Sequence, residues 1–335
     1  MKISLCLVLA LSCAAPAFAI VTVTSPTNGA ELVSPFALVA TASPCSLQTI
    51  TAMGYSLDSS SSTTTVKSTS INLQVNAPLG PHVLHVKSWG SMGAVCTTNV
   101  NISIVPDPVS SVPSTATVVS NIQVLTNWKA ENDTATGNGT STGTMKLVSA
   151  PSLSGVARSF YTTYTNAAGE RYHVSYGADL LATNFLYDGW IFIDGSIADV
   201  ANLELDMNQV TTNGQTVIYG FQCDGYTRTW DYTQNAGTPQ SPNDQWLHSA
   251  ASCNLQTWAP NAWHHVQISY SRDNAGNVTY KSVWLDGVQQ DINATVPSSF
   301  ALGWGSTLLT NFQVDGLGGY GSSTLYLDSL TIYRW

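Results

Sequence analysis

Short runs of alternating apolar and polar residues recur along this chain, and residues that favour turns separate them. A period of two places every second side chain on one face of a β-strand. No stretch shows a convincing period of a long amphipathic helix, so the pattern predicts an all-β protein. The strands expected in the N-terminal part are 21–24, 36–41, 71–75, 82–89 and 100–105; those in the C-terminal part are 171–176, 190–193, 203–207, 216–221, 264–270, 278–285 and 324–333.

Residues 107–114 are rich in Pro and Ser and lack periodicity, which is typical of a short, semi-rigid linker. We therefore expect one domain over residues 20–106 and a second over 115–335. The spacing of the short strands in the first domain predicts an immunoglobulin-like sandwich. Residues 80–86 and 100–104 also resemble the last strands of bacterial Ig-like modules.

The second domain contains Trp263-His264-His265-Val266 and, after a further strand, Asp286-Gly287. These residues resemble the W-x-H-V…D-G signature of laminin-G-like and concanavalin A-like jelly rolls. Residues 325–333 resemble the final strand of that superfamily, and the resemblance spans roughly 170–335. It implies a jelly-roll sandwich that binds glycans across a concave sheet.

The segment Leu203-Glu204-Leu205-Asp206-Met207-Asn208-Gln209 resembles the E-x-D-x-x-E catalytic strand of family 16 glycoside hydrolases. In that family the first Glu is the nucleophile and the last Glu is the acid/base, which Gln209 replaces here. An amide binds a sugar hydroxyl but cannot transfer the proton that retaining hydrolysis needs. Glu204 and Asp206 share a face, whereas Gln209 joins that face only if a β-bulge adds one residue.

Ten tryptophans and fourteen tyrosines suit a protein that stacks aromatic rings on sugars. We expect the stacking residues to be Trp230 and Tyr232, which share a strand face, together with Trp246 and Trp258 around the segment between Cys223 and Cys253.

Residues 1–19 fit a secretory signal, because Lys2 precedes an apolar core and Ala17-Phe18-Ala19 matches an A-x-A cleavage site. No later apolar run is long enough to span a membrane. Four cysteines then remain in an exported protein, which predicts two disulfides. Three connectivities are possible, and the domain boundaries favour Cys45–Cys96 with Cys223–Cys253.

Charged residues make up only 9% of the chain, and the formal net charge is -9. This composition argues against a nucleic-acid partner, which requires a basic stripe. No organic cofactor is implied, because phosphate-binding and dinucleotide-binding loops are missing. A structural calcium ion is expected from the jelly-roll resemblance, with Asp328 as its best ligand candidate.

The sequence thus predicts a secreted protein that recognises a polysaccharide through its jelly roll, using Glu204, Asp206, Gln209 and the aromatic residues. One alternative is a polysaccharide-degrading hydrolase that uses Glu204 and Asp206, or a lyase for which Arg171 and His173 are candidates. The known motifs of jelly-roll alginate lyases are not matched. Another alternative is a cell-surface module that contacts another protein.

Overall fold

The computed structural model describes residues 21–133, 139–195 and 197–335, and the predicted leader, residues 1–19, lies outside them. Within these ranges the regular elements are β-strands and the short 3-10 helices η1 (Pro108–Ser111), η2 (Ile122–Val124) and η3 (Leu255–Thr257), so the protein is all-β as predicted. None of the described helices has the length and apolar character that a membrane span requires. The chain divides into two compact units, of which the second is Val105–Trp335. Residues 107–114, expected to form a linker, therefore belong to the second unit.

The first unit is a pair of β-sheets with strand orders β1-β3-β6 and β2-β8-β7-β4-β5. Its strands are β1 (Val21–Ser25), β2 (Ala30–Leu32), β3 (Phe36–Ala42), β4 (Ile50–Leu57), β5 (Thr64–Val66), β6 (Ser70–Val75), β7 (Gly80–Gly90) and β8 (Val95–Ile104). Alternate residues such as Phe36, Leu38 and Leu84 are fully buried. The predicted Cys45–Cys96 disulfide is confirmed.

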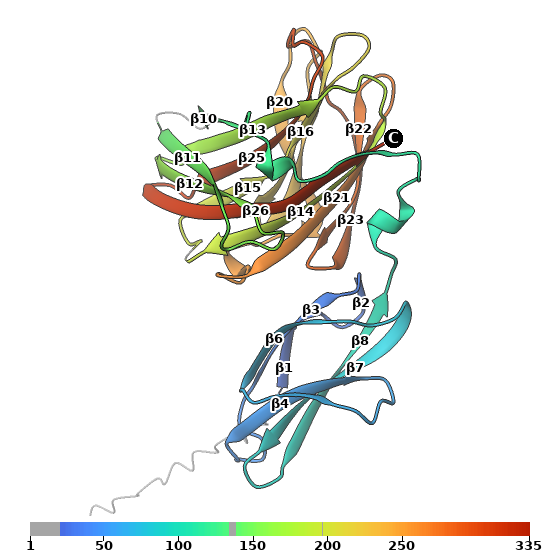
Figure 1. The fold of residues 1–335 in the computed structure, drawn as a ribbon, viewed down its shortest axis with the longest axis vertical. Coiled ribbons are helices and arrows are strands. Elements are labelled where there is room, and N and C mark those ends of the chain that lie inside the picture. The colour runs from blue at the N-terminus through green and yellow to red at the C-terminus, as the bar shows by residue number, and fades with distance from the viewer. Residues whose placement is uncertain (1–20, 134–138, 196) are drawn as a thin grey trace, which may run out of the picture. The chain divides into compact units, whose positions relative to one another are not determined.

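The second unit contains a front sheet and a back sheet (Figure 1). The front sheet has β10 (Lys129–Asp133), β13 (Gly169–Gly177), β25 (Leu308–Gly316), β15 (Val200–Glu204), β16 (Met207–Val210), β17 (Thr216–Tyr219), β18 (Phe221–Asp224), β19 (Thr229–Asn235), β20 (Asp244–Ser252) and β24 (Ser299–Phe300). The back sheet has β11 (Thr140–Val148), β12 (Ala157–Thr165), β26 (Tyr320–Arg334), β14 (Asn184–Asp194), β21 (Trp263–Arg272), β22 (Asn277–Leu285) and β23 (Val288–Pro297), and β9 (Thr117–Val119) pairs with β26.

Aromatic side chains fill much of the space between these two sheets. Phe160 of the back sheet stacks on Phe312 of the front sheet, with ring centroids 4.7 Å apart. Phe221 and Trp230 stack at 5.2 Å. Such pairs are stabilising beyond the apolar area that they bury. The predicted Cys223–Cys253 disulfide is also confirmed, and it ties β18 to the residue that follows β20.

Strands β15 and β16 form one interrupted strand in the middle of the front sheet. Glu204 pairs with Gln313 of β25, and Met207 pairs with Thr310. The two pairs are separated by three residues on each strand. The register is therefore unchanged across the interruption, and no residue of phase is added.

Asp328 of β26 anchors the segment that precedes β12. Its carboxylate accepts hydrogen bonds from Ser152 Oγ (2.7 Å), Leu153 N (2.6 Å), Ser154 N (3.1 Å), Ser154 Oγ (2.5 Å) and Gln123 Nε2 (3.3 Å). Burial raises the pKa of Asp328, but these hydrogen bonds outweigh burial and lower it below its usual value. Hydrogen-bond donors of the protein therefore surround the Asp328 carboxylate, and a structural calcium ion stays a prediction.

The first prediction concerns this anchor. Asp328→Asn should lower the free energy of unfolding by about 3 kcal/mol, because an amide NH₂ would face donors inside the protein. Urea unfolding would measure the change. Asp291→Asn is the matched control, since Asp291 is exposed and bonds only to surface side chains such as Ser282. Equal stability of the two variants would contradict the anchoring role.

Candidate functional site

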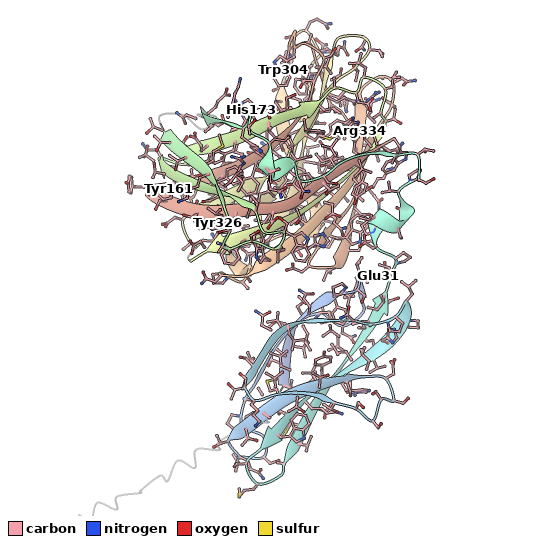
Figure 2. The ribbon with its side chains drawn as sticks, viewed as in Figure 1. Glu31, Tyr161, His173, Trp304, Tyr326 and Arg334 are labelled. Atoms are coloured by element: carbon pink, nitrogen blue, oxygen red, sulfur yellow. A yellow bond between two sulfur atoms is a disulfide. The ribbon has the colours of Figure 1, made fainter. Side chains whose placement is uncertain are left out.

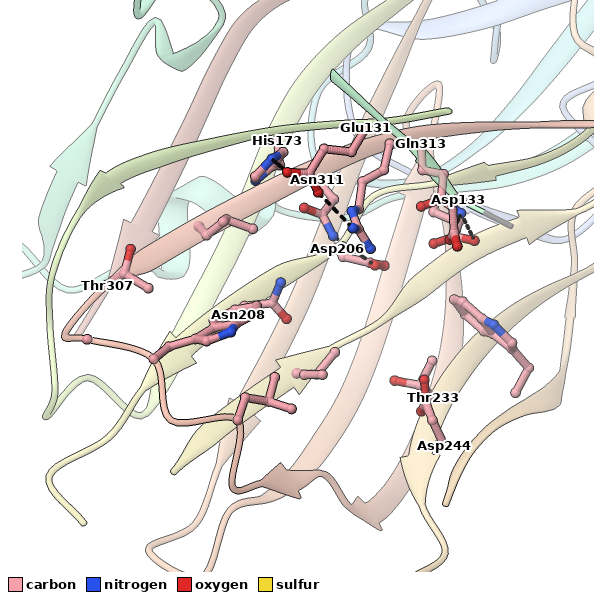
Figure 3. A pocket seen from close by; sticks show the side chains of 18 of the residues that line it. Glu131, Asp133, His173, Asp206, Asn208, Thr233, Asp244, Thr307, Asn311 and Gln313 are labelled. Carbon is pink, nitrogen blue, oxygen red and sulfur yellow. Dashed lines mark hydrogen bonds and ion pairs between the residues drawn. The ribbon is translucent and has the colours of Figure 1, made fainter. Parts of the chain in front are cut away.

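A groove of about 770 Å³ lies over the face of the front sheet that points away from the core. Strands β10, β13, β15, β16, β17, β19, β20 and β25 contribute side chains to it, and so does the segment 301–307. Figure 3 shows these side chains converging from several strands onto one space. The groove is large enough for a small ligand or for part of a polymer chain.

Strict alternation along the central strand selects which residues face the groove. Glu204, Asp206 and Asn208 line it, whereas Leu205 and Met207 between them are buried in the core. The predicted shared face of Glu204 and Asp206 is therefore present. The sequence analysis missed Asn208, although its spacing of two from Asp206 would have found it.

Gln209 lies on the core side of the same strand and does not reach the groove. It donates hydrogen bonds to the carbonyls of Asp179 (2.7 Å) and Ala182 (2.9 Å), and it accepts them from Tyr219 Oη (3.0 Å) and Arg272 Nε (2.7 Å). This corrects its predicted role in ligand binding. The bulge that would have turned it outward is absent, because the pairing register continues unchanged through residues 205 and 206.

Three of the four predicted stacking residues also belong to the core. Trp230 is fully buried, Tyr232 packs against Tyr280 with ring centroids 5.1 Å apart, and Trp258 lies 6.4 Å from Trp230. Trp230 and Tyr232 do share a strand face, but that face points inward. These placements correct the predictions for Trp230, Tyr232 and Trp258.

Two other indole rings stand at the groove. Trp246 of β20, the fourth predicted stacking residue, lines it, and Trp304 lines it from the segment 301–307. Trp304 is 42% exposed and is labelled in Figure 2. The sequence analysis missed Trp304. The glycines on either side of it, Gly303 and Gly305, are a sequence signal for a loop, where an aromatic residue is more often exposed.

A cluster of carboxyl groups surrounds the side-chain amide of Gln313. Its Nε2 donates to Glu204 Oε1 (2.8 Å), Asp133 Oδ2 (3.0 Å) and Asp315 Oδ1 (3.1 Å). Burial, and then the charges of Asp315 and Asp206, raise the pKa of Glu204 well above its usual value. Burial likewise raises the pKa of Asp315 to about 6. The side chain of Asp315 thus contributes, through its charge and as a hydrogen-bond partner, to the raised pKa of Glu204.

Asp206 is a second buried carboxyl group in the groove. It accepts a hydrogen bond from the backbone N–H of Phe221 at 2.9 Å and a long one from Asn311 Nδ2 at 3.5 Å (Figure 3). Burial raises the pKa of Asp206 to about 7 even though these hydrogen bonds oppose the shift. Asp206 therefore exchanges its proton near neutral pH.

Arg171 and His173 of β13 face Glu131 of β10 at one side of the groove. Arg171 Nη2 lies 2.9 Å from Glu131 Oε2, and His173 Nε2 lies 3.3 Å from Glu131 Oε1 without hydrogen-bonding geometry. The hydrogen bond from Arg171 lowers the pKa of Glu131, and burial lowers the pKa of His173. The guanidinium group is thus already paired.

Several buried polar atoms of groove residues have no hydrogen-bond partner among the described residues. They are Asn208 Oδ1, Asn311 Oδ1, His173 Nε2 and Thr233 Oγ1. Buried polar atoms in proteins are almost always paired, and an unpaired one costs roughly 1–3 kcal/mol. Four in one groove indicate a surface that is completed by something other than the protein.

The two histidines of the Trp263–Val266 motif have structural partners. His264 Nδ1 lies 2.7 Å from Asp286 Oδ2, and the backbone N–H of His265 donates to Asp286 Oδ1 at 2.9 Å. Neither histidine lines the groove.

No protein-family model matches the sequence, and no curated protein matches it. Among solved structures, a carbohydrate-binding module of the β-sandwich superfamily is 12% identical, with 93% of this chain and 96% of that chain covered and a TM-score of 0.34. A carbohydrate esterase from a Shiga toxin-encoding bacteriophage is 14% identical, with coverages of 65% and 99% and a TM-score of 0.37. Peanut lectin is 14% identical, with coverages of 66% and 99% and a TM-score of 0.30. At these TM-scores the likenesses carry no weight for function.

The second prediction follows from Asp206. Its pKa is higher in the folded protein than in the unfolded chain, so its protonation stabilises the fold below about pH 4, and this stability is lost as the pH rises to about 7. Asp206→Asn removes that loss and keeps an acceptor for Phe221 N. We expect the variant to melt a few degrees above the wild type at pH 8 and close to it at pH 4.

Thermal unfolding at several pH values would measure this difference, with Asp291→Asn as the control that changes little at any pH. A difference between Asp206→Asn and wild type that does not vary with pH would show that Asp206 is ionised throughout.

Proposed function

We propose that this is an exported carbohydrate-binding protein that holds a glycan in the groove of its second unit, a concanavalin A-like jelly roll. The first unit, which we take to be Ig-like, serves as a spacer. The observation that carries the proposal is the set of four unpartnered polar atoms on the floor of a groove with two indole rings beside it.

Sugar rings match both parts of this surface. Their hydroxyl groups donate and accept hydrogen bonds, which would satisfy Asn208, Asn311 and Thr233. Their C–H faces pack on aromatic rings, for which Trp246 and Trp304 are available. A ligand without hydroxyl or amino groups would leave the polar atoms unpaired.

Two disulfides support export, because such bonds persist in oxidising compartments. The expected signal sequence at residues 1–19 accords with it. A nucleic acid is a poor ligand for this groove, since Glu204 and Asp206 would face its phosphates.

The third prediction tests the two indoles. Trp246→Ala and Trp304→Ala should each weaken binding of the preferred polysaccharide about tenfold, because each removes on the order of 1.5 kcal/mol of buried apolar contact. Affinity electrophoresis against a panel of polysaccharides would find the ligand and measure the loss.

Tyr161→Ala is the matched control, because Tyr161 is an exposed aromatic residue of β12 in the back sheet (Figure 2). Binding that weakens equally in this control, or not at all in the tryptophan variants, would place the ligand elsewhere.

A second candidate function is hydrolysis of the bound glycan. Two carboxyl groups with raised pKa in one groove, Glu204 and Asp206, are an arrangement that hydrolases use as acid and nucleophile. Binding without cleavage remains the leading proposal. The acid/base of the family 16 strand corresponds to Gln209, which points into the core, and Glu204 already bonds to Gln313 and Asp315.

The fourth prediction separates binding from cleavage. Incubation of the purified protein with neutral and acidic polysaccharides should release no new chain ends, as measured by reducing sugar and by unsaturated products. Release that disappears in Glu204→Gln would establish hydrolysis and overturn the binding-only proposal.

The remaining alternatives receive less support. A uronate lyase needs a free cation to neutralise the substrate carboxylate, but Arg171 is paired with Glu131 and the groove is strongly acidic. A protein-interaction surface would be supported by a flat face poor in aromatic residues. The front sheet instead is hollowed and carries two indole rings.

A further inference from the structure

The groove is lined by far more acidic than basic side chains. Five carboxylic residues line it, against one arginine and one histidine. The five are Glu131, Asp133, Glu204, Asp206 and Asp244. Arg171 is paired with Glu131, and the other four form no ion pair with a Lys, Arg or His among the described residues. Acidic groups therefore outnumber basic groups around a ligand in the groove.

Acceptors outnumber the donors available to them around Gln313, and two amide oxygens of the groove have no donor among the described residues. Nε2 of Gln313 carries two hydrogens, yet three carboxyl groups lie within 3.1 Å of it. Asn208 Oδ1 and Asn311 Oδ1 are acceptors with no donor in the part of the chain that the structure describes. The groove thus lacks positive charge beside most of its carboxyl groups, and some of its buried acceptors lack a donor.

We propose that the groove selects glycans that carry protonated amino groups, that is, polymers or oligomers of amino sugars. This inference rests on the proposed glycan-binding function and names the ligand class of the same site. An ammonium group supplies one positive charge and three donors, and it would lie among Asp206, Glu204 and the unpartnered Asn208 and Asn311 oxygens.

Other sugars satisfy the groove less completely. A neutral sugar offers hydroxyl donors but leaves the carboxyl groups without a counter-charge. A uronic acid would bring a carboxylate close to four carboxyl groups that have no cationic partner. Repulsion between like charges in a poorly solvated site is costly. An N-acetylated amino sugar has the same ring as its amine but neither the charge nor the three donors.

The titration of the carboxyl groups agrees with this assignment. Burial and the charges of Asp315 and Asp206 raise the pKa of Glu204, and burial raises the pKa of Asp206, so both groups hold their protons to a higher pH than ordinary carboxyl groups. A bound ammonium would favour the ionised carboxylates and displace those protons. Binding should therefore release protons, which a neutral sugar would not cause.

The experiment is a titration of the purified protein, by calorimetry at about pH 6, with three β-1,4-linked hexasaccharides. They are the hexamers of glucosamine, N-acetylglucosamine and glucose, which differ in the substituent at carbon 2. Glucosamine and galactosamine monomers, each with its N-acetyl form, serve as probes that do not depend on the linkage. We expect the free amine to bind at least about tenfold more tightly than its acetylated partner, with the preference reduced by salt.

The variants Asp206→Asn and Glu204→Gln keep the size of each side chain and remove its charge. Each should weaken binding of the amino sugar about tenfold more than it weakens binding of the N-acetyl form, because only the amino sugar loses a charge partner. Asp291→Asn, on β23 of the back sheet, is the charge-matched control and should change neither. Because binding of the N-acetyl form is measured in the same variants, a misfolded protein is recognised by the loss of both.

Four outcomes would overturn the inference. Equal or tighter binding of the neutral or acetylated sugars would reject amine selection and leave the proposed glycan binding intact. Amine binding with no proton release in buffers of different ionisation enthalpy would also reject it. Binding that is abolished by a chelator and restored by calcium would assign the carboxyl groups to an ion. Absence of binding to any probe or to any polysaccharide of the earlier panel would remove both proposals.

Discussion

One pairing constraint organises the site: the interrupted strand β15–β16 keeps a single register against β25. Because side chains alternate strictly along a strand, this register decides the face of every residue in it. It places Glu204, Asp206 and Asn208 in the groove and Gln209 in the core. A slip of one residue would bury three polar groups beside Phe312 and expose Leu205, so the hydrophobic core enforces the same register that builds the site.

The buried carboxyl groups of the groove are electrostatically unfavourable for the fold. Its carboxyl groups are brought together around one amide, and their raised pKa values record the cost of holding charge there. A protein under no functional pressure could place an apolar residue at Glu204 at little cost, since buried ionisable groups rarely add stability. Ligand binding therefore explains why carboxyl groups that do not stabilise the fold are gathered here.

Pattern and chemistry in the sequence predicted much of the fold. The all-β class and the shared face of Glu204 and Asp206 followed from alternation, and the expected domain boundaries favoured the two disulfides. The site could be predicted only in part. A pair such as Trp230 and Tyr232 shares a face by its spacing alone. Whether that face is core or groove depends on packing with other strands, such as that of Tyr232 against Tyr280 of the back sheet, 48 residues away in sequence. Segments 129–133 and 308–316, which supply much of the groove, are β10 and β25, strands absent from the predicted set.

Neighbouring residues show how structural and functional polar groups differ. Gln209 and Asn208 are both buried amides on β16. Gln209 makes four hydrogen bonds, to groups from the segment 179–182 and from β17 and β21. Both its amide nitrogen and its amide oxygen are therefore paired within the sandwich. Asn208 has a side-chain oxygen with no hydrogen-bond partner among residues 21–133, 139–195 and 197–335. Burial does not distinguish these two amides, but their hydrogen bonding does. The amide whose hydrogen bonds are complete supports the fold, and the amide with an unpaired oxygen faces the groove.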